Sequence, residues 1–447
     1  MDFEGSQDKE TTMGAAPLSP KTTKQEGHII EASNLDKNRF SIWSTIGIQF
    51  AVAAAPVAVT GYSSLIPGAG GSTYFFWGYI VAIAGQLIIA LSLAELASAL
   101  PHASGQIYWA FALAPPRMSR FLSYFNGTWT VFGWIFATAA SAIFAADFII
   151  AFAMIVSPDY IPHSWHVYIL AVAVICIGFI LNTALIAIFP FITSFMIIFL
   201  FTALLVKTAA KASAQTTFVD VINETGWDSD GVVFLISLIP GLLTISLFDT
   251  AIHLAEEMPD PARQVPIVML GNVLLSAVGG LTMVVALIFC TTHPENLLEP
   301  LGGQAILQIC WDAWPSLGFC IATSVLFVAN YMNGMTTIVT ASSRVPWTFA
   351  RAGGLPFKGW LSHVDHRLHV PLNAVLTVCI VTAVVDLLEF GPSTVLNGLF
   401  GAAGICFAMS YAMPIALLLI RGRGGLSNRR YLNLGGFGVP LNFIALG

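Results

Sequence analysis

Four residues that could carry out acid–base or metal chemistry fall within nine positions of a chain that is otherwise poor in charge. They are Asp249, His253, Glu256 and Glu257, in the stretch FDTAIHLAEEMPDPARQVP at positions 248–266. At about 100° per residue these side chains share one helical face. Such a face could bind a metal ion, exchange protons, or form the polar end of a helix that leaves a membrane. The choice between these depends on the rest of the chain.

The metal and enzyme hypotheses find no support elsewhere in the sequence. No second cluster of histidine and carboxylate residues is available to complete a metal site, and no nucleophile or catalytic signature accompanies the acids. The six cysteines are scattered without CxxC pairing. We therefore expect no metal, no cofactor and no enzymatic activity, and the basic loops do not indicate a nucleic-acid partner.

Composition indicates an all-α integral membrane protein. Of the 447 residues 56% are hydrophobic and only 9% are charged, and the mean hydropathy is +0.80. A membrane helix needs about 20 apolar residues. Ten complete runs of about that length or more are present, and an eleventh begins near Phe437 and stops with the sequence at Gly447. The ten runs fall at about 41–62, 74–99, 120–156, 165–183, 186–207, 231–252, 267–290, 313–340, 370–389 and 395–420.

These runs divide the chain into three parts. Residues 1–39 are polar and lack the apolar core of a signal peptide, so we expect a disordered cytoplasmic tail. Residues 40–420 form the ten-helix core, and 421–447 form a cytoplasmic loop and the start of an eleventh helix.

The distribution of basic residues predicts the orientation. With a cytoplasmic N-terminus, 16 of the 18 lysines and arginines face the cytoplasm, and only Lys207 and Lys211 do not. Asn223, in the sequon NET, then lies outside, where it could be glycosylated. The 16 are Lys9, Lys21, Lys24, Lys37, Arg39, Arg117, Arg120, Arg263, Arg344, Arg351, Lys358, Arg367, Arg421, Arg423, Arg429 and Arg430.

Two of the predicted spans contain helix-breaking residues near their middles. The first carries Ala53–Ala55 followed by Pro56, and the sixth carries Pro240 and Gly241. Broken backbone at the midplane is tolerated where protein or water satisfies the freed groups, and a pair of broken helices five spans apart is typical of inverted-repeat transporters. The alternative is that these residues are simply common in membrane helices.

Long motifs carry a resemblance to a known family. They are SLAELASALPHASGQIYWAFALAPP at 92–116, the stretch at 248–266, SSRVPWTFARAGGLPFKGWLSHVDHRLHVPLNAV at 342–375, and NETGW at 223–227. With these motifs the chain resembles the fungal amino acid/choline transporter family of the amino acid–polyamine–organocation superfamily, which includes choline and γ-aminobutyrate permeases. The resemblance implies a LeuT-like core of five-plus-five inverted repeats and proton-coupled uptake at the plasma membrane.

The candidate site residues follow from the broken helices and the aromatic side chains near them. Helix ends at a break expose amide and carbonyl groups, and aromatic rings attract an ammonium group. The predicted substrate-binding residues are Phe50, Ala53, Ala54, Ala55, Trp134, Pro240, Gly241, Thr244, Phe248 and Tyr331. Asp249, Glu95 and Glu256 are predicted at an inner gate or in proton coupling, because acids at membrane depth mark ion or substrate paths. Asp147 is a weaker candidate for the outer vestibule.

The leading hypothesis is a secondary active transporter for a small amine-bearing solute: an amino acid, γ-aminobutyrate or a choline-like compound. It works by alternating access, with the first, second, sixth and seventh spans rocking against the rest. Choline-type relatives tend to carry Asn and Trp in the first break, where this chain has Ala54, Ala55 and Pro56. That difference keeps open a transporter of a specialised metabolite or its precursor. A non-transporting sensor or truncated paralogue is a further alternative.

Overall fold

The computed structural model describes residues 41–447 apart from 185–201, 203–205, 208–209, 366 and 427–429. The described residues form helices joined by loops, with one isolated β-bridge between Ala69 and Asn223. Nine helical segments among them are long and apolar enough to cross a membrane. Their bounds are Ile42–Leu65, Gly71–Ala99, Ser119–Val156, Ser164–Asn182, Asp230–His253, Pro261–Cys290, Leu317–Arg351, Leu372–Phe390 and Gly401–Arg421. The predicted tail and most of the predicted span at 186–207 lie outside the described residues.

Seven of these spans contain one long helix, and two are assembled from short pieces. The long helices are α3 (Gly71–Ala99), α5 (Ser119–Val156), α6 (Ser164–Ala184), α12 (Pro261–Cys290), α14 (Leu317–Arg351), α16 (Leu372–Val385, continued by η6, Asp386–Phe390) and α17 (Ser393–Arg421). The first span comprises α1 (Ile42–Ala53), α2 (Ala55–Ala58) and η2 (Val59–Leu65). The other assembled span comprises α9 (Asp230–Ser237), α10 (Ile239–Ile245) and α11 (Thr250–His253), followed by η3 (Ala255–Glu257).

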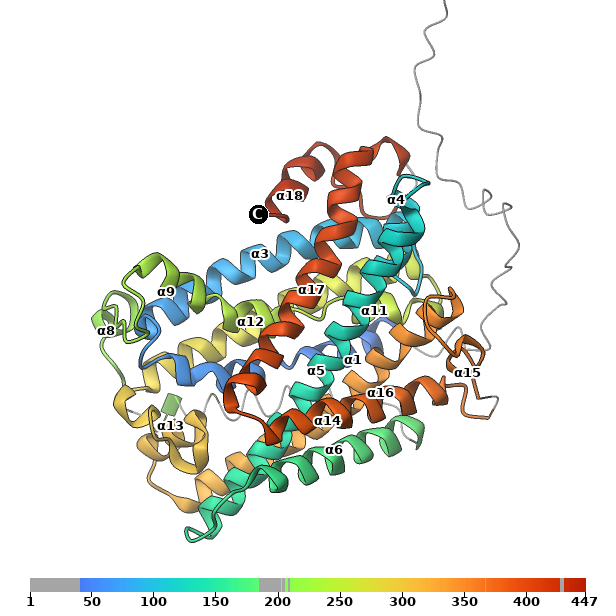
Figure 1. The fold of residues 1–447 in the computed structure, drawn as a ribbon. Helices are drawn as coiled ribbons and strands as arrows, with labels where there is room; N and C mark the ends of the chain where they lie inside the picture. The colour runs from blue at the N-terminus through green and yellow to red at the C-terminus, as the bar shows by residue number, and fades with distance from the viewer. Residues whose placement is uncertain (1–40, 185–201, 203–205, 208–209, 366, 427–429) are drawn as a thin grey trace, which may run out of the picture.

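Short helices cap the two ends of the bundle. Most of them lie in the loops between spans, and η7, η8 and α18 follow the last span. They are α4 (Gln106–Leu113), α8 (Ala214–Phe218), α13 (Ala305–Ala313), α15 (Lys358–Leu361) and α18 (Gly438–Ile444), with single 3₁₀ turns η4 (Pro294–Leu297), η5 (Leu301–Gly303), η7 (Arg423–Gly425) and η8 (Gly435–Phe437). In Figure 1, α4, α15 and α18 lie at one end and α8 and α13 at the other.

We name the two ends by their charge. The basic end holds the start of α1 and the ends of α3, α14 and α17, with Arg351, Arg421 and Arg423. The acidic end holds the loop before α9, with Asp220, Glu224, Asp228 and Asp230. This separation of charge is the pattern from which the orientation was predicted.

The prediction for the eighth span, at 313–340, is wrong at its far end. The helix continues eleven residues further, to Arg351. The predicted apolar run stops before the polar residues Ser342–Arg344, which are buried in protein: Ser343 and Arg344 are 0% and 1% exposed. Their polar groups are satisfied by neighbouring side chains and carbonyls.

The helices pack in two groups. In the first group α12 packs along α3, and the assembled spans with α1, α2 and α10 pack on this pair. In the second group α5, α6, α14 and α16 pack on one another. α17 crosses α5 and also reaches α3 and α4 (Figure 1). The first group consists of the spans predicted to rock together.

Both assembled spans are interrupted near the middle of the bundle. Ala54 separates α1 from α2 in left-handed backbone geometry, with φ 40° and ψ 36°. After α10 the chain is extended at Ser246 and left-handed at Leu247, with φ 65°, before α11 begins. Left-handed geometry costs a non-glycine residue about 1–2 kcal/mol. The Gln49 side chain offsets part of this by donating a hydrogen bond to the Phe248 carbonyl, 2.6 Å from Nε2.

The break predicted at Pro240 and Gly241 corresponds to a single turn residue, Leu238, which separates α9 from α10 in helical geometry, with φ −72° and ψ −25°. Pro240 and Gly241 lie within α10, and the interruption with non-helical backbone comes after Ile245. Proline in the first turn of a helix removes an N–H that has no partner there in any case. Gly241 has a packing role instead, because a Cβ atom on it would lie 2.4 Å from the Cβ of Ala82 on α3.

This packing predicts that Gly241→Val destabilises the fold. A branched side chain forced against α3 should cost about 1–3 kcal/mol by overpacking, seen as a lower melting temperature and less monodisperse protein after detergent extraction. Gly85→Val on α3 is the matched control, because no atom lies within 4 Å of a Cβ at that position. Equal behaviour of the two variants would contradict the packing role.

Candidate functional site

A cavity of about 120 Å³ lies where the two breaks face α5, α14 and α17. This volume suits a small solute and is far below that of a site for a drug-sized ligand. The lining residues are Ala51–Ala54, Ala58 and Tyr62 of the first span, Ala137, Ala140, Ser141 and Phe144 of α5, Leu243, Thr244, Ser246 and Leu247 at the second break, Asn330, Tyr331 and Gly334 of α14, and Ala403, Gly404 and Phe407 of α17.

Small residues dominate this wall. Nine of its twenty members are alanine or glycine, so methyl groups and backbone form much of the surface. At the first break the four residues Ala51–Ala54 all line the cavity. Their small side chains let a bound solute approach the backbone more closely than larger side chains would.

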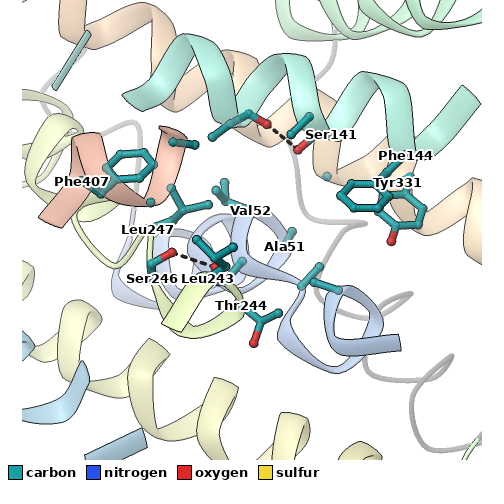
Figure 2. A pocket seen from close by; sticks show the side chains of 18 of the residues that line it. Ala51, Val52, Ser141, Phe144, Leu243, Thr244, Ser246, Leu247, Tyr331 and Phe407 are labelled. Carbon is teal, nitrogen blue, oxygen red and sulfur yellow. Dashed lines mark hydrogen bonds between the residues drawn. The ribbon is translucent and has the colours of Figure 1, made fainter. Parts of the chain in front are cut away.

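Aromatic rings form two parts of the wall. Tyr331 of α14 stacks on Phe144 of α5, with ring centroids 6.2 Å apart, and on Phe148 at 5.4 Å. Figure 2 shows Phe144 and Tyr331 together at one side of the cavity and Phe407 at the other. The faces of such rings carry partial negative charge and attract cations.

The serine and threonine hydroxyl groups of the wall are arranged as hydrogen-bond acceptors. Each of these three donates its hydrogen to a helix carbonyl: Ser141 to Ala137 at 2.9 Å, Thr244 to Pro240 at 2.7 Å and Ser246 to Leu243 at 2.7 Å. Two of these bonds appear as dashed lines in Figure 2. A hydroxyl that has donated its hydrogen can still accept through its oxygen. None of the twenty lining residues carries a lysine, arginine, histidine or acidic side chain.

Four of the ten predicted binding residues line this cavity: Ala53, Ala54, Thr244 and Tyr331. The other six are not part of its wall: Phe50, Ala55, Trp134, Pro240, Gly241 and Phe248. Trp134 instead packs edge-on against His253, and Phe248 packs on Tyr411 of α17. Both rings lie between the cavity and the basic end.

The structure adds lining residues that were not predicted, among them Tyr62, Ser141, Phe144 and Phe407. On α5 a pattern was available, because Ala137, Ala140, Ser141 and Phe144 recur every three or four residues and so form one helical stripe. Tyr62 lies in a 3₁₀ segment after the break, where the spacing of an α-helix does not apply.

Asp249 and His253 form a buried hydrogen-bonded cluster below the second break. Asp249 Oδ2 lies 3.2 Å from His253 Nε2 and accepts a hydrogen bond from Gln106 Nε2 at 2.8 Å. His253 Nδ1 lies 3.1 Å from the carbonyl oxygen of Ala103. The cluster joins α11 to the loop before α4 and to α4 itself.

The remaining predicted gate residues form ion pairs at the basic end. Glu256 lies 2.8 Å from Arg351, and Glu257, which is 1% exposed, lies 3.1 Å from the equally buried Arg344. These two pairs join η3 of the first group to α14 of the second. Glu95 on α3 pairs with Arg423, and its Oε1 lies 3.0 Å from Arg430 Nε and accepts a hydrogen bond from the Leu434 amide.

The predicted glycosylation site lies in the loop before α9. Asn223 is exposed, and its side-chain amide donates a hydrogen bond to the Trp227 carbonyl at 2.8 Å. The Thr225 hydroxyl of the sequon donates to Asn223 Oδ1, also at 2.8 Å. Modification at Asn223 stays a prediction.

Comparison with known proteins identifies the fold and the family. The family model described as amino acid permease matches residues 40–446. The chain belongs to this family. It is therefore a permease rather than an enzyme, and the predicted family and LeuT-like all-α fold are confirmed.

Individual relatives of the permease agree with this. It is 29% identical to the choline transporter of Saccharomyces cerevisiae over 92% of its own length and 74% of that protein. It is 26% identical to the GABA-specific permease of the same yeast, covering 87% of this chain and 70% of the relative. In structure it is similar to MhsT in complex with L-phenylalanine, with a TM-score of 0.57 at 12% identity, over 90% of this chain and 98% of MhsT.

The buried ion pair at the basic end predicts a strong effect of Glu257→Ala on the stability of the permease. The change leaves the buried Arg344 guanidinium without its carboxylate partner, which typically costs about 3–5 kcal/mol. The measurement is the melting temperature in detergent, with Glu295→Ala as control because its pair with His293 is 61% and 66% exposed and contributes little. Replacing both partners by Glu257→Leu and Arg344→Met should restore much of the loss. A large effect of the control change would show that the assay does not report the buried pair.

Proposed function

We propose that the permease carries a small amine-bearing solute, such as an amino acid, γ-aminobutyrate or a choline-like compound, together with a proton. The observation that carries this proposal is the chemistry of the cavity wall. Hydroxyl oxygens, small residues at both helix breaks and aromatic rings surround a space without charged side chains. Acceptors and ring faces favour an ammonium group. The named activities of the two yeast relatives support the same class of cargo.

An acidic residue just beyond the aromatic wall supports a cationic group on the cargo. Asp147 follows Phe144 by one turn of α5, on the side of the acidic end, and interacts electrostatically with Tyr331. A carboxylate at this position would raise the local concentration of a cation entering from that end. We propose that it forms part of the outer vestibule.

We further propose that the protein lies in the plasma membrane with its N-terminus in the cytoplasm. Sixteen of its 18 basic residues then face the cytoplasm, as the positive-inside rule requires. The basic end becomes the inner end of the path, and the Asn223 sequon lies outside. Alternating access would rock the first helix group against the second, so opening the inner end means separating the Glu256–Arg351 and Glu257–Arg344 pairs.

Uptake measurements test the proposed function. The full-length protein, fused to a fluorescent protein to confirm surface localisation, is expressed in a yeast strain that lacks its own amine permeases. We expect uptake of at least one labelled solute among choline, γ-aminobutyrate and the amino acids, and a strong reduction when a protonophore removes the proton gradient. Absence of uptake of every solute by surface-localised protein would contradict the proposal.

The aromatic wall predicts that Phe144→Leu weakens solute binding. Loss of one ring face removes about 1–2 kcal/mol of attraction for a cation, equivalent to a KM raised about 5- to 30-fold. Phe132→Leu is the matched control on the same helix, because Phe132 is 46% exposed at the outside of the bundle. The cavity would not be the binding site if the two variants transported the solute with equal KM.

A further inference from the structure

The buried pair of Asp249 and His253 lies next to the cavity, on the side of the basic end. Both side chains are 0% exposed, and Asp249 follows the lining residue Leu247 by two positions. Asp249 precedes the first turn of α11 but makes no side-chain capping bond to it. Its conformation is therefore not explained by helix capping, which is the usual structural role of an aspartate at this place.

The contacts of the imidazole determine where its hydrogens lie. Nδ1 faces the carbonyl oxygen of Ala103 at 3.1 Å, and a carbonyl only accepts, so Nδ1 carries a hydrogen and donates it. Nε2 faces Asp249 Oδ2 at 3.2 Å. That contact is favourable only if a hydrogen lies between the two atoms, on the ring or on the carboxyl group.

Counting hydrogens gives the state of the pair. With both contacts satisfied, the pair is either an imidazolium with a carboxylate or a neutral imidazole with a carboxylic acid. In either form it has no net charge and holds one proton more than a neutral imidazole beside a carboxylate. The Tyr411 hydroxyl is the remaining polar group beside the Asp249 carboxyl, and a permanently ionised carboxylate is costly at this depth.

Loss of that proton would break a hydrogen bond between α11 and the loop before α4. The neutral imidazole has a single N–H, which can face either Asp249 or Ala103 but not both. If the single N–H lies on Nε2 and donates to the Asp249 carboxylate, Nδ1 carries no hydrogen. The hydrogen bond from Nδ1 to the Ala103 carbonyl is then lost. The protonated pair thus favours the closed arrangement of α11 against the loop before α4, and the deprotonated pair favours opening of the basic end.

Several groups surround the pair. α4 contributes the neutral Gln106, α5 the ring of Trp134, and α17 Tyr411, which interacts electrostatically with Asp249. The charged groups nearest along the chain, Glu256 and Glu257, are paired with arginines of α14. In the loop before α4, burial lowers the pKa of His102, whose Nδ1 accepts a hydrogen bond from the Ser104 amide, so His102 does not compete for a proton at neutral pH.

We propose that the Asp249–His253 pair binds the proton that the permease carries with its solute and releases it to water at the basic end as that end opens. This inference rests on the proposed function and adds the residues that carry the proton and the contact that couples it to opening. The proton moves between the pair and water, and no other bond changes.

Transport in proteoliposomes tests the pair separately from the proposed function. The probe is the labelled amine that the wild-type protein takes up. Exchange of this solute without a pH gradient measures solute transport alone, and accumulation driven by an imposed pH gradient measures coupling. Asp249→Asn keeps the shape of the side chain but cannot take up a proton. We expect it to retain exchange and to lose pH-driven accumulation by about tenfold or more, a coupling of ordinary size.

Asp260→Asn is the matched control, because this exposed acid lies in the loop after η3 and forms no side-chain ion pair within the described chain. Retention of full pH-driven accumulation by Asp249→Asn overturns the proposal. Failure of wild-type protein in both assays counts against the proposed function instead, and wild-type exchange without pH-driven accumulation overturns the assignment of a coupled proton.

A second variant and a measurement on the wild-type protein cover the case in which Asp249→Asn does not fold. His253→Gln removes the imidazole and should uncouple transport in the same way. Should this variant also fail to fold, infrared difference spectra of wild-type protein with and without solute should show a carboxylic-acid or imidazolium band that changes with solute. Absence of any such band overturns the proposal.

Discussion

A hydrocarbon bilayer offers no hydrogen bonds, so each peptide group that leaves helical geometry at membrane depth must find a partner inside the protein. Two segments of this permease leave helical geometry, at Ala54 and at Ser246–Phe248. The first broken span supplies a partner for the second, because Gln49 of α1 donates to the Phe248 carbonyl. The cavity, its acceptor-rich wall and the acid–base pair below it all depend on these two segments being held side by side.

Charge in this protein is kept out of the cavity and concentrated where helix groups meet. The Glu257–Arg344 pair is almost completely buried between η3 and α14. Because desolvation offsets most of the Coulombic attraction in such a pair, its net contribution to stability is small compared with the cost of removing one partner alone. When the two helix groups separate and water enters between them, Glu257 and Arg344 become hydrated as their ion pair breaks. A contact of this kind can open and close repeatedly with little change in free energy.

Much of the fold could be predicted from the sequence, and the site only in part. The spans followed from long apolar runs, and the break at Ala54 from the alanines beside Pro56. The second break contains neither proline nor glycine, and its geometry at Leu247 arises from tertiary contacts that local sequence does not encode. Tyr331 was identified, whereas Phe50 and Trp134 are buried and do not line the cavity. Which face of a membrane helix meets a cavity depends on its rotation and tilt, and a largely apolar helix gives little periodic signal for either beyond a stripe of small residues such as that on α5.

The alanine-rich wall has a consequence for how this architecture could change its cargo over evolutionary time. Where methyl groups line a space, a single mutation to serine, valine or threonine inserts one or two heavy atoms and leaves the backbone path intact. Selectivity could then be adjusted in small steps of volume and polarity, with the hinge points and the ion pairs left untouched. One scaffold could in this way give rise to carriers for many different metabolites.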